Sequence, residues 1–337
     1  MPENPRGIAR LNWRALVDET LRRRKAEKLT QREHAALANI SIPTMAAFER
    51  GETTLTLSKA LDILRVVGLV DEAAGEGAQE AFVREAFARW RSLTAPLPQD
   101  TPARFPHGCY RFDYCLEGEL KTPDLAAFEL MLRKVVNPHT IWPVFWVPNQ
   151  PEIAPREVDG AIECWVALKG QRGTERHSDD AAHSDFWRAA PSGRLFFMRG
   201  YTEDSQETFP PGTILDTILP IWRMGEALLH AEKLASLMRQ NDRAAPAIRF
   251  RALYSGLSGR ILRAWANPLT DILVEGHTAR SDEALLETVI PADGVTARLA
   301  EHLFPLVSSL YERFGIVGLS ENRVKADVDR LLKSRTG

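Results

Sequence analysis

The chain has 337 residues, of which 44% are hydrophobic and 26% charged, and its formal net charge at pH 7 is −2. This length predicts two domains, and the lack of about 18 consecutive apolar residues excludes a membrane-spanning helix. Three cysteines without a CxxC spacing predict reduced thiols rather than disulfides or a zinc site. Because the N-terminus also lacks an apolar leader, we expect a cytoplasmic protein.

Charge is unevenly distributed along the chain. Residues 1–70 contain 12 Lys and Arg against 8 Asp and Glu, whereas the remainder is acidic. A basic segment of this kind is typical of a region that meets a negatively charged partner.

Four short helices are predicted in this basic region. Apolar residues at helical spacing predict a first helix that begins near Trp13 and ends in a basic run. Capping patterns at Thr30, Ser41 and Thr56 predict the starts of three more helices. Gly51 is expected to end the third helix, because glycine adopts the left-handed conformation at low cost.

The stretch "LTQREHAALANISIPTMAAFERGETTLTLSKALDIL", residues 29–64, resembles the Cro/CI-type helix-turn-helix family, also called XRE regulators. The resemblance rests on Leu-Thr-Gln opening the second helix, an internal alanine, a turn, an apolar–Glu–x–Gly ending and a capped fourth helix. It implies an all-α, lambda-repressor-like domain of four to five helices over residues 10–70. Composition alone also allows a helical hairpin used for protein contacts.

The family resemblance implies which side chains would meet DNA. In this family the third helix enters the major groove, and the N-terminus of the second helix abuts a phosphate. The base-facing residues would be Ser41, Ile42, Pro43, Thr44 and Ala47. Basic charge and matching position together predict phosphate contacts from Arg22, Arg23, Lys25, Gln31, Arg32, Thr53 and Thr54. Arg24 and Glu49 would form a structural ion pair that does not read sequence.

The predicted base-facing set has few hydrogen-bonding groups. Ile42, Pro43 and Ala47 can pack on thymine methyl groups, and Thr44 can donate or accept a hydrogen bond. We therefore expect DNA shape and phosphate contacts to contribute much of the recognition. Glu52 stands where the family often has a basic residue, which weakens the backbone contact. The alternative is a domain that has lost DNA binding and serves in dimerisation.

Residues 71–106 are predicted to connect two domains. An amphipathic helix over residues 79–93 precedes a segment with four prolines, Pro96, Pro98, Pro102 and Pro106. Such a segment suits neither a helix nor a central strand.

Residues 107–337 are predicted to form a larger α+β domain. Short apolar runs rich in aromatic and β-branched residues predict strands. These runs are residues 109–118, 140–148, 161–168, 194–202 and 247–265. Helical spacing predicts a long packed helix over residues 220–240, and two further helices near the C-terminus, the last of them capped by Ser320.

A polar stretch in this domain contains a candidate metal set. His177, Asp179, Asp180, His183 and Asp185 are metal-ligand residue types. The two histidines are six residues apart, a spacing that suits neither one helix face nor an alternating strand. A solvated loop is therefore the favoured interpretation, and no metal site is predicted.

No catalytic residue or cofactor is predicted either. Cys109, Cys115 and Cys164 lie in expected strands, where a cysteine usually acts as a small hydrophobe. The chain has no P-loop, Rossmann, nucleophile-elbow or zincin motif. Seven of the eight tryptophans lie outside the helix-turn-helix region and are interpreted as core. The alternative is an aromatic ligand pocket with Arg199, Arg223 or Glu226 as a polar anchor, although Arg223 and Glu226 are also spaced for an ordinary helical ion pair.

These features together predict a bacterial, sequence-specific transcription regulator that is not an enzyme. It would bind a pseudo-palindromic operator in double-stranded DNA as a homodimer, because two reading heads multiply the contacts of one short helix. The C-terminal domain is predicted to dimerise the protein and is a candidate sensor of a small-molecule ligand. Two alternatives remain: a protein-interaction adaptor, or an enzyme that uses His177, His183 or Cys164 and is fused to a regulatory head.

Overall fold

The computed structural model describes residues 12–70, 77–136, 139–140, 142–166, 180–241, 245–265 and 277–334. The chain divides into two compact units, Met1–Ala88 and Arg89–Gly337, and the division falls within helix α5 (Ala78–Thr94). The larger unit therefore includes the proline-rich half of the segment predicted as a connection. Among the described residues, no helix is both long and apolar enough to cross a membrane.

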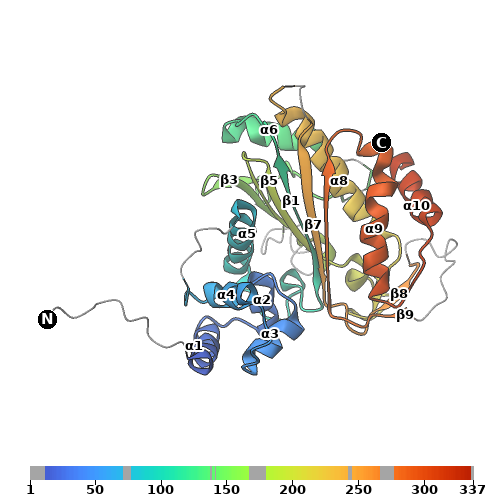
Figure 1. Cartoon of the computed structure of the whole chain (residues 1–337). Helices are drawn as coiled ribbons and strands as arrows, with labels where there is room; N and C mark the ends of the chain where they lie inside the picture. The colour runs from blue at the N-terminus through green and yellow to red at the C-terminus, as the bar shows by residue number, and fades with distance from the viewer. Residues whose placement is uncertain are drawn as a thin grey trace. The chain divides into compact units, whose positions relative to one another are not determined.

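Among its described residues, the smaller unit contains four short helices and the first part of α5 (Figure 1). The four short helices are α1 (Trp13–Ala26), α2 (Gln31–Leu37), α3 (Ile42–Glu49) and α4 (Leu57–Val66). The side chains of Asn12, Thr30, Ser41 and Thr56 each accept a backbone N–H at a helix start. The capping box is complete, because the N–H of Thr30 donates to Glu33 Oε2 at 2.8 Å and the N–H of Glu33 donates to Thr30 Oγ1 at 3.1 Å.

The core of the smaller unit forms where these helices meet. Val17 from α1, Met45 and Phe48 from α3 and Ile63 from α4 are fully buried in one cluster. Trp13 packs edge-on against Phe48 with 5.3 Å between the ring centroids. Because α3 turns Met45 and Phe48 into this core, its opposite face is left at the surface.

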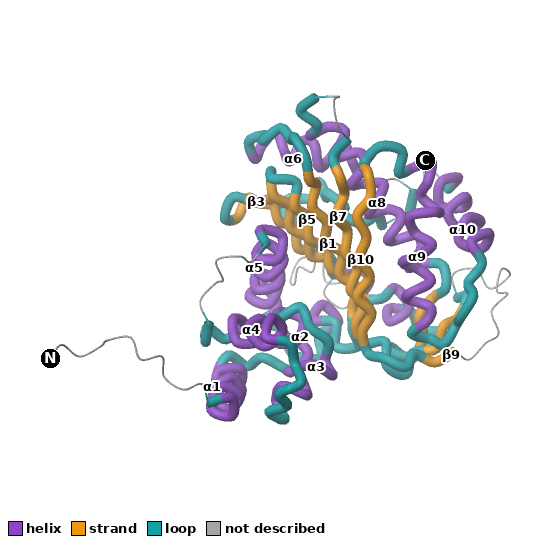
Figure 2. The backbone as a smooth tube through the Cα atoms, viewed as in Figure 1, coloured by secondary structure: helices purple, strands orange, loops and turns teal. Residues whose placement is uncertain are grey.

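A seven-stranded antiparallel sheet forms the centre of the larger unit, in the order β10-β7-β1-β5-β4-β3-β2 (Figure 2). Its strands are β1 (Cys109–Glu117), β2 (Arg156–Val158), β3 (Ala161–Trp165), β4 (Phe186–Ala190), β5 (Arg194–Gly200), β7 (Ala247–Ser255) and β10 (Glu283–Pro291). A second sheet of three short strands has the order β6-β8-β9 and consists of β6 (Ile214–Asp216), β8 (Ile261–Arg263) and β9 (His277–Thr278).

Helices cover one face of the large sheet (Figure 1). They are α6 (Leu125–Val135), α8 (Leu219–Met238), α9 (Leu299–Glu312) and α10 (Glu321–Lys333). Strand β1 shows why this face is the core side: Tyr110, Phe112 and Tyr114 alternate into the hydrophobic core, whereas Arg111 and Asp113 point to the other face. The chain thus combines an all-α N-terminal unit with a larger α+β unit, as predicted.

One predicted strand is wrong and several elements were missed. In the segment 140–148 the described residues form no strand, because Pro143 and Pro148 cannot donate to a ladder. Phe145 instead has a left-handed backbone, with φ of 54°, and is buried in the core. Strands β4 and β10 and helix α6 were not predicted, although the Asp124 side chain caps α6 by accepting the N–H of Ala127 at 2.7 Å.

The start of α8 depends on a buried carboxylate. Asp216 Oδ1 accepts the N–H groups of Ile218 and Leu219 at 2.6 and 2.8 Å, and its Oδ2 accepts the N–H of Trp265 at 2.8 Å. The N–H of Asp216 itself donates to Glu203 Oε1 at 2.6 Å. Burial, and then the charge of Asp216, raises the pKa of Glu203 to about 7.

The raised pKa of Glu203 predicts a pH-dependent stability. The folded protein holds a proton on Glu203 that the unfolded chain releases near its ordinary pKa of 4.5. The stabilisation that this proton gives to the folded state is therefore fully present below about pH 4.5 and is lost as the pH rises through about 7. A shift of this size corresponds to about 3 kcal/mol.

Glu203→Gln should remove this dependence, since glutamine is neutral at every pH. Urea unfolding should show the variant gaining about 3 kcal/mol over the wild type between pH ~4 and pH ~8. The matched control Glu207→Gln removes an exposed carboxylate of the same segment. Its free energy of unfolding should differ from that of the wild type by the same amount at every pH. The same pH-independent difference for Glu203→Gln would contradict the raised pKa assigned to Glu203.

Candidate nucleic-acid interface

The five residues predicted to face bases lie at the N-cap of α3 and along its first two turns. Ser41 and Pro43 are exposed, and Ile42, Thr44 and Ala47 are partly buried. Ile42 packs against the core cluster of Met45 and Phe48, so the set does not lie entirely on the face opposite the core.

The surface of α3 offers little hydrogen-bonding capacity. Its two hydroxyl groups bond to each other, with Ser41 Oγ and Thr44 Oγ1 2.8 Å apart. Ser41 Oγ also accepts the N–H of Thr44 at 3.3 Å, which caps the helix. Ile42, Pro43 and Ala47 present only apolar atoms from their side chains. Such a face suits thymine methyl groups better than the donor and acceptor edges of guanine or adenine.

Glu49 at the end of α3 ties together three helices. Its Oε1 lies 3.1 Å from Arg24 Nη2 on α1, which is the ion pair expected from the family resemblance. Its Oε2 accepts a hydrogen bond from Gln31 Nε2 at 2.9 Å. Gln31 is the first residue of α2, so the predicted phosphate contact is held in place by the same carboxylate that positions α3.

Two of the predicted phosphate-binding arginines make contacts within the unit. Arg22 and Arg23 both donate to Glu19, at distances of 2.6 to 2.8 Å. These two arginines lower the pKa of Glu19 to about 2. Arg23 Nη1 also donates to the carbonyls of Val67 and Gly68 at 3.0 and 2.8 Å, so it holds α1 to the end of α4. Arg22 remains exposed at the surface.

The other predicted phosphate contacts lie at or near helix ends. Lys25 is exposed in the last turn of α1, Arg32 is half-buried in the first turn of α2, and Thr53 and Thr54 are exposed before α4. The carboxylate of Glu52 pairs with Arg50 Nη2 at 2.7 Å, so its charge is compensated by a neighbour on the same loop.

Sequence reasoning missed the contacts that anchor α1 to the end of α3. Trp13 Nε1 donates to the carbonyl of Gly51 at 3.0 Å, and Arg14 Nη1 donates to the carbonyl of Arg50 at 3.4 Å. No pattern in the sequence marks these contacts, because they join residues more than 30 positions apart. They hold the loop that leads from α3 to Thr53.

The candidate metal set does not assemble among the described residues. His177 and Asp179 lie outside them. His183 Nδ1 is 2.5 Å from Asp180 Oδ2, whereas Asp185 binds Arg199. In the described part of the chain, no group of three His, Cys, Asp or Glu side chains is arranged to hold a metal ion.

Two of the three cysteines have the surroundings of core residues. Cys164 is buried, and its thiol donates to the carbonyl of Ile153 at 3.3 Å. Burial raises the pKa of the Cys164 thiol well above its usual value, which disfavours the thiolate that nucleophilic attack requires. Burial likewise raises the pKa of Cys115.

The polar anchors proposed for a ligand pocket are buried in ion pairs. Arg199 donates to both carboxylate oxygens of Asp185, at 2.6 and 2.5 Å. Arg223 Nη1 lies 2.9 Å from Glu226 Oε2, the helical pair expected from the sequence. Arg223 also lines a pocket whose aromatic walls are tyrosines rather than tryptophans.

Glu49 provides a test of how the interface is held. Glu49→Ala leaves Arg24 and Gln31 without their shared acceptor, and it should lower the free energy of opening of α2 and α3 by about 1–3 kcal/mol. Hydrogen exchange of these helices in the full chain measures this free energy. Glu52→Ala, which breaks an exposed pair, should change it by less than about 0.5 kcal/mol. Equal effects of the two substitutions would contradict the role given to Glu49.

Comparison with known proteins supports the assignment of the smaller unit. The helix-turn-helix family model matches residues 21–73, which cover the end of α1, all of α2 to α4 and the contacts of Glu49. No curated protein and no solved structure matches the chain. The N-terminal part of this chain is therefore a helix-turn-helix domain of the Cro/CI (XRE) family.

Proposed function

We propose that this protein is a sequence-specific transcription regulator that binds double-stranded DNA as a homodimer. The helix-turn-helix match supports DNA binding by a regulator of this general class. The observation that carries the finer proposal is the start of α3, where five small or apolar residues stand at the positions that read bases in the family.

The composition of that set favours a dimer. The hydroxyls of Ser41 and Thr44 are its side-chain hydrogen-bonding groups, and they already bond to each other. One copy of α3 can therefore discriminate few base pairs directly. Two copies placed about 34–36 Å apart on a pseudo-palindromic operator would double the base contacts and add phosphate contacts from both units.

We assign dimerisation and ligand sensing, rather than catalysis, to the larger unit. The environment of Cys164 supports this assignment, because a buried thiol with a raised pKa is a poor nucleophile. His183 is engaged by Asp180 and stacks edge-on against Trp142, with 4.4 Å between the ring centroids. Both residues therefore have structural roles that account for their positions.

Selection from a genomic fragment library at two salt concentrations tests the proposal. The full-length protein should enrich a motif with two-fold symmetry, and sedimentation of the complex should show two chains on each DNA. Binding without a motif that falls steeply with salt would indicate a non-specific role. No binding at either salt would favour a protein-interaction adaptor.

Two substitutions distinguish a residue that contacts phosphate from a residue that contacts bases. Lys25→Gln should weaken binding equally on all sequences and reduce the slope of log K against log salt by about 0.9, because one phosphate contact is lost. Thr44→Ala should instead reduce the preference for the selected motif by about 1 kcal/mol and leave the slope unchanged. Lys325→Gln, an exposed change on α10, is the matched control. Equal changes in motif preference and in salt slope for Lys25→Gln and Thr44→Ala would contradict the assigned roles.

A further inference from the structure

Strand β10 forms one edge of the large sheet (Figure 2). Within the part of the chain that the structure describes, its one partner strand is β7, and the two pair along all nine residues of β10. The strand at the other edge, β2, has three residues, of which Arg156 and Glu157 are exposed. Short, charged edge strands resist pairing with another chain, whereas a long edge strand is a template for such pairing. The two edges of the sheet therefore differ in their capacity to accept another strand.

The backbone groups at the free edge of β10 belong to its odd-numbered residues. Directly after the strand, the N–H of Ala292 donates to the carbonyl of Pro246 at 2.8 Å, and this pair continues the register of β7 and β10. In an antiparallel ladder, residues that bond to one neighbouring strand alternate with residues that face the other way. Leu285, Glu287 and Val289 therefore direct their N–H and C=O groups away from β7. Among the described residues, no group outside the sheet is hydrogen-bonded to the backbone of these three.

The same three residues form an exposed surface. Leu285 and Val289 are large hydrophobic side chains that are 37% and 52% exposed, and Glu287, which lies between them, is also exposed. The even-numbered residues point to the other face of the sheet, where Leu286 and Ile290 are buried in the core. The free edge thus combines outward-facing backbone groups with two exposed apolar side chains.

The side chains along this edge are arranged symmetrically about Glu287. Leu285 and Val289 stand two residues to either side of it, and Glu283 and Pro291 end the strand four residues away. A two-fold axis through Glu287, perpendicular to the sheet, would place Leu285 of each copy opposite Val289 of the other. An interface between two identical copies must be self-complementary in this way. Apolar cross-strand pairs of this kind stabilise a sheet.

Two residues of β10 limit the extent and strength of such a contact. In the symmetric register the two Glu287 carboxylates face each other, and like charges directly opposite are destabilising. Pro291 lacks the N–H that would continue the ladder beyond the end of the strand. The register can therefore be tested at Glu287, because neutralising this residue should strengthen the contact.

We propose that two copies of this chain associate through β10, as antiparallel strands paired about Glu287, to form one continuous sheet. Pairing through β10 leaves the short strand β2 at both outer edges, so the assembly ends at two chains. The proposal rests on the proposed function, which requires a homodimer, and it names the surface that forms this homodimer. Because β10 belongs to the larger unit, association can be measured without DNA.

Cysteine cross-linking of the full-length protein tests the register. Hydrogen-bonded partners in an antiparallel pair have Cα atoms about 5.5 Å apart, a distance that a disulfide spans. Glu287→Cys should therefore form disulfide-linked dimers under mild oxidation. Val289→Cys alone should not, because the two copies of residue 289 would lie about 14 Å apart along the strands. A mixture of the Val289→Cys and Leu285→Cys proteins should cross-link, and the wild type controls for its three native cysteines.

Sedimentation equilibrium of the reduced proteins measures the strength of the contact. The wild type should be a dimer at micromolar concentration, and Glu287→Gln should tighten it about threefold. Leu285→Lys together with Val289→Lys should weaken it at least about tenfold, because like charges would replace apolar pairs. The matched control is Leu130→Lys, which changes a 60% exposed leucine on α6 and should have no effect. Thermal unfolding checks that each variant is folded.

Three results would overturn the proposal. They are a monomeric wild type, a folded double-lysine variant that dimerises as tightly as the wild type, and no more cross-linking of Glu287→Cys than of the wild type. A monomeric wild type would favour a strand of another protein as the occupant of this edge.

The outcomes also separate this inference from the proposed function. A protein that binds its operator as a dimer without cross-linking through residue 287 would contradict only the interface. A protein that cross-links through residue 287 but binds no DNA would contradict the proposed function and leave the interface intact.

Discussion

The burial of helix α8 is the constraint on which the larger unit depends. Fourteen of its 20 residues are buried, so the helix must be covered on almost every side. The large sheet covers one side, and α6, α9 and α10 cover others. Gly225 permits the approach of α10, since a Cβ at this position would lie 2.9 Å from Leu331. A central helix of this kind requires a complete shell, which explains why the unit extends from β1 to α10.

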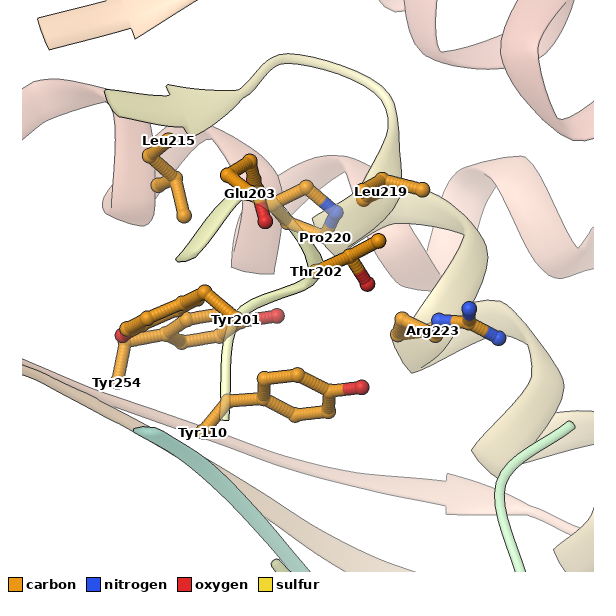
Figure 3. A pocket seen from close by; sticks show the side chains of 9 residues that line it. All are labelled: Tyr110, Tyr201, Thr202, Glu203, Leu215, Leu219, Pro220, Arg223 and Tyr254. Carbon is orange, nitrogen blue, oxygen red and sulfur yellow. The ribbon is translucent and has the colours of Figure 1, made fainter. Parts of the chain in front are cut away.

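Burial of α8 also determines where polar groups must find partners. Arg223, Glu226 and His230 lie within the buried length of the helix, and an unpaired charge there would be strongly destabilising. Trp142 supplies part of the compensation, because its backbone carbonyl accepts from both Arg199 and Arg223. Backbone carbonyls used in this way are not available for a sheet ladder. Tyr110 and Arg223 line a small pocket beside the first turn of α8 (Figure 3).

In the smaller unit, polar side chains position helices that are short. Its helices are too short to be stable alone, so capping and one shared carboxylate, Glu49, position them. The sequence of α3 then separates two tasks, because Met45 and Phe48 hold the core while Thr44 and its small neighbours remain outside. In the function that we propose, a surface with so few donors would make recognition depend on DNA shape, phosphate contacts and a second copy of the domain. The larger unit would supply that second copy by dimerisation and respond to a ligand.

The sequence by itself determined the elements whose signals are local. Capping boxes, helical spacing and glycine ends depend on residues a few positions apart, so the four N-terminal helices and the long helix near residues 220–240 were predictable. Only the tertiary structure decided which face of a strand is core, that the described residues of the apolar run 140–148 form no strand, and that Arg23 binds Val67 and Gly68. The pocket belongs to this second group, because Tyr110 and Tyr254 are brought together by strand pairing across 144 residues. Contacts at such separations carry no periodic signal in the chain, and only packing specifies them.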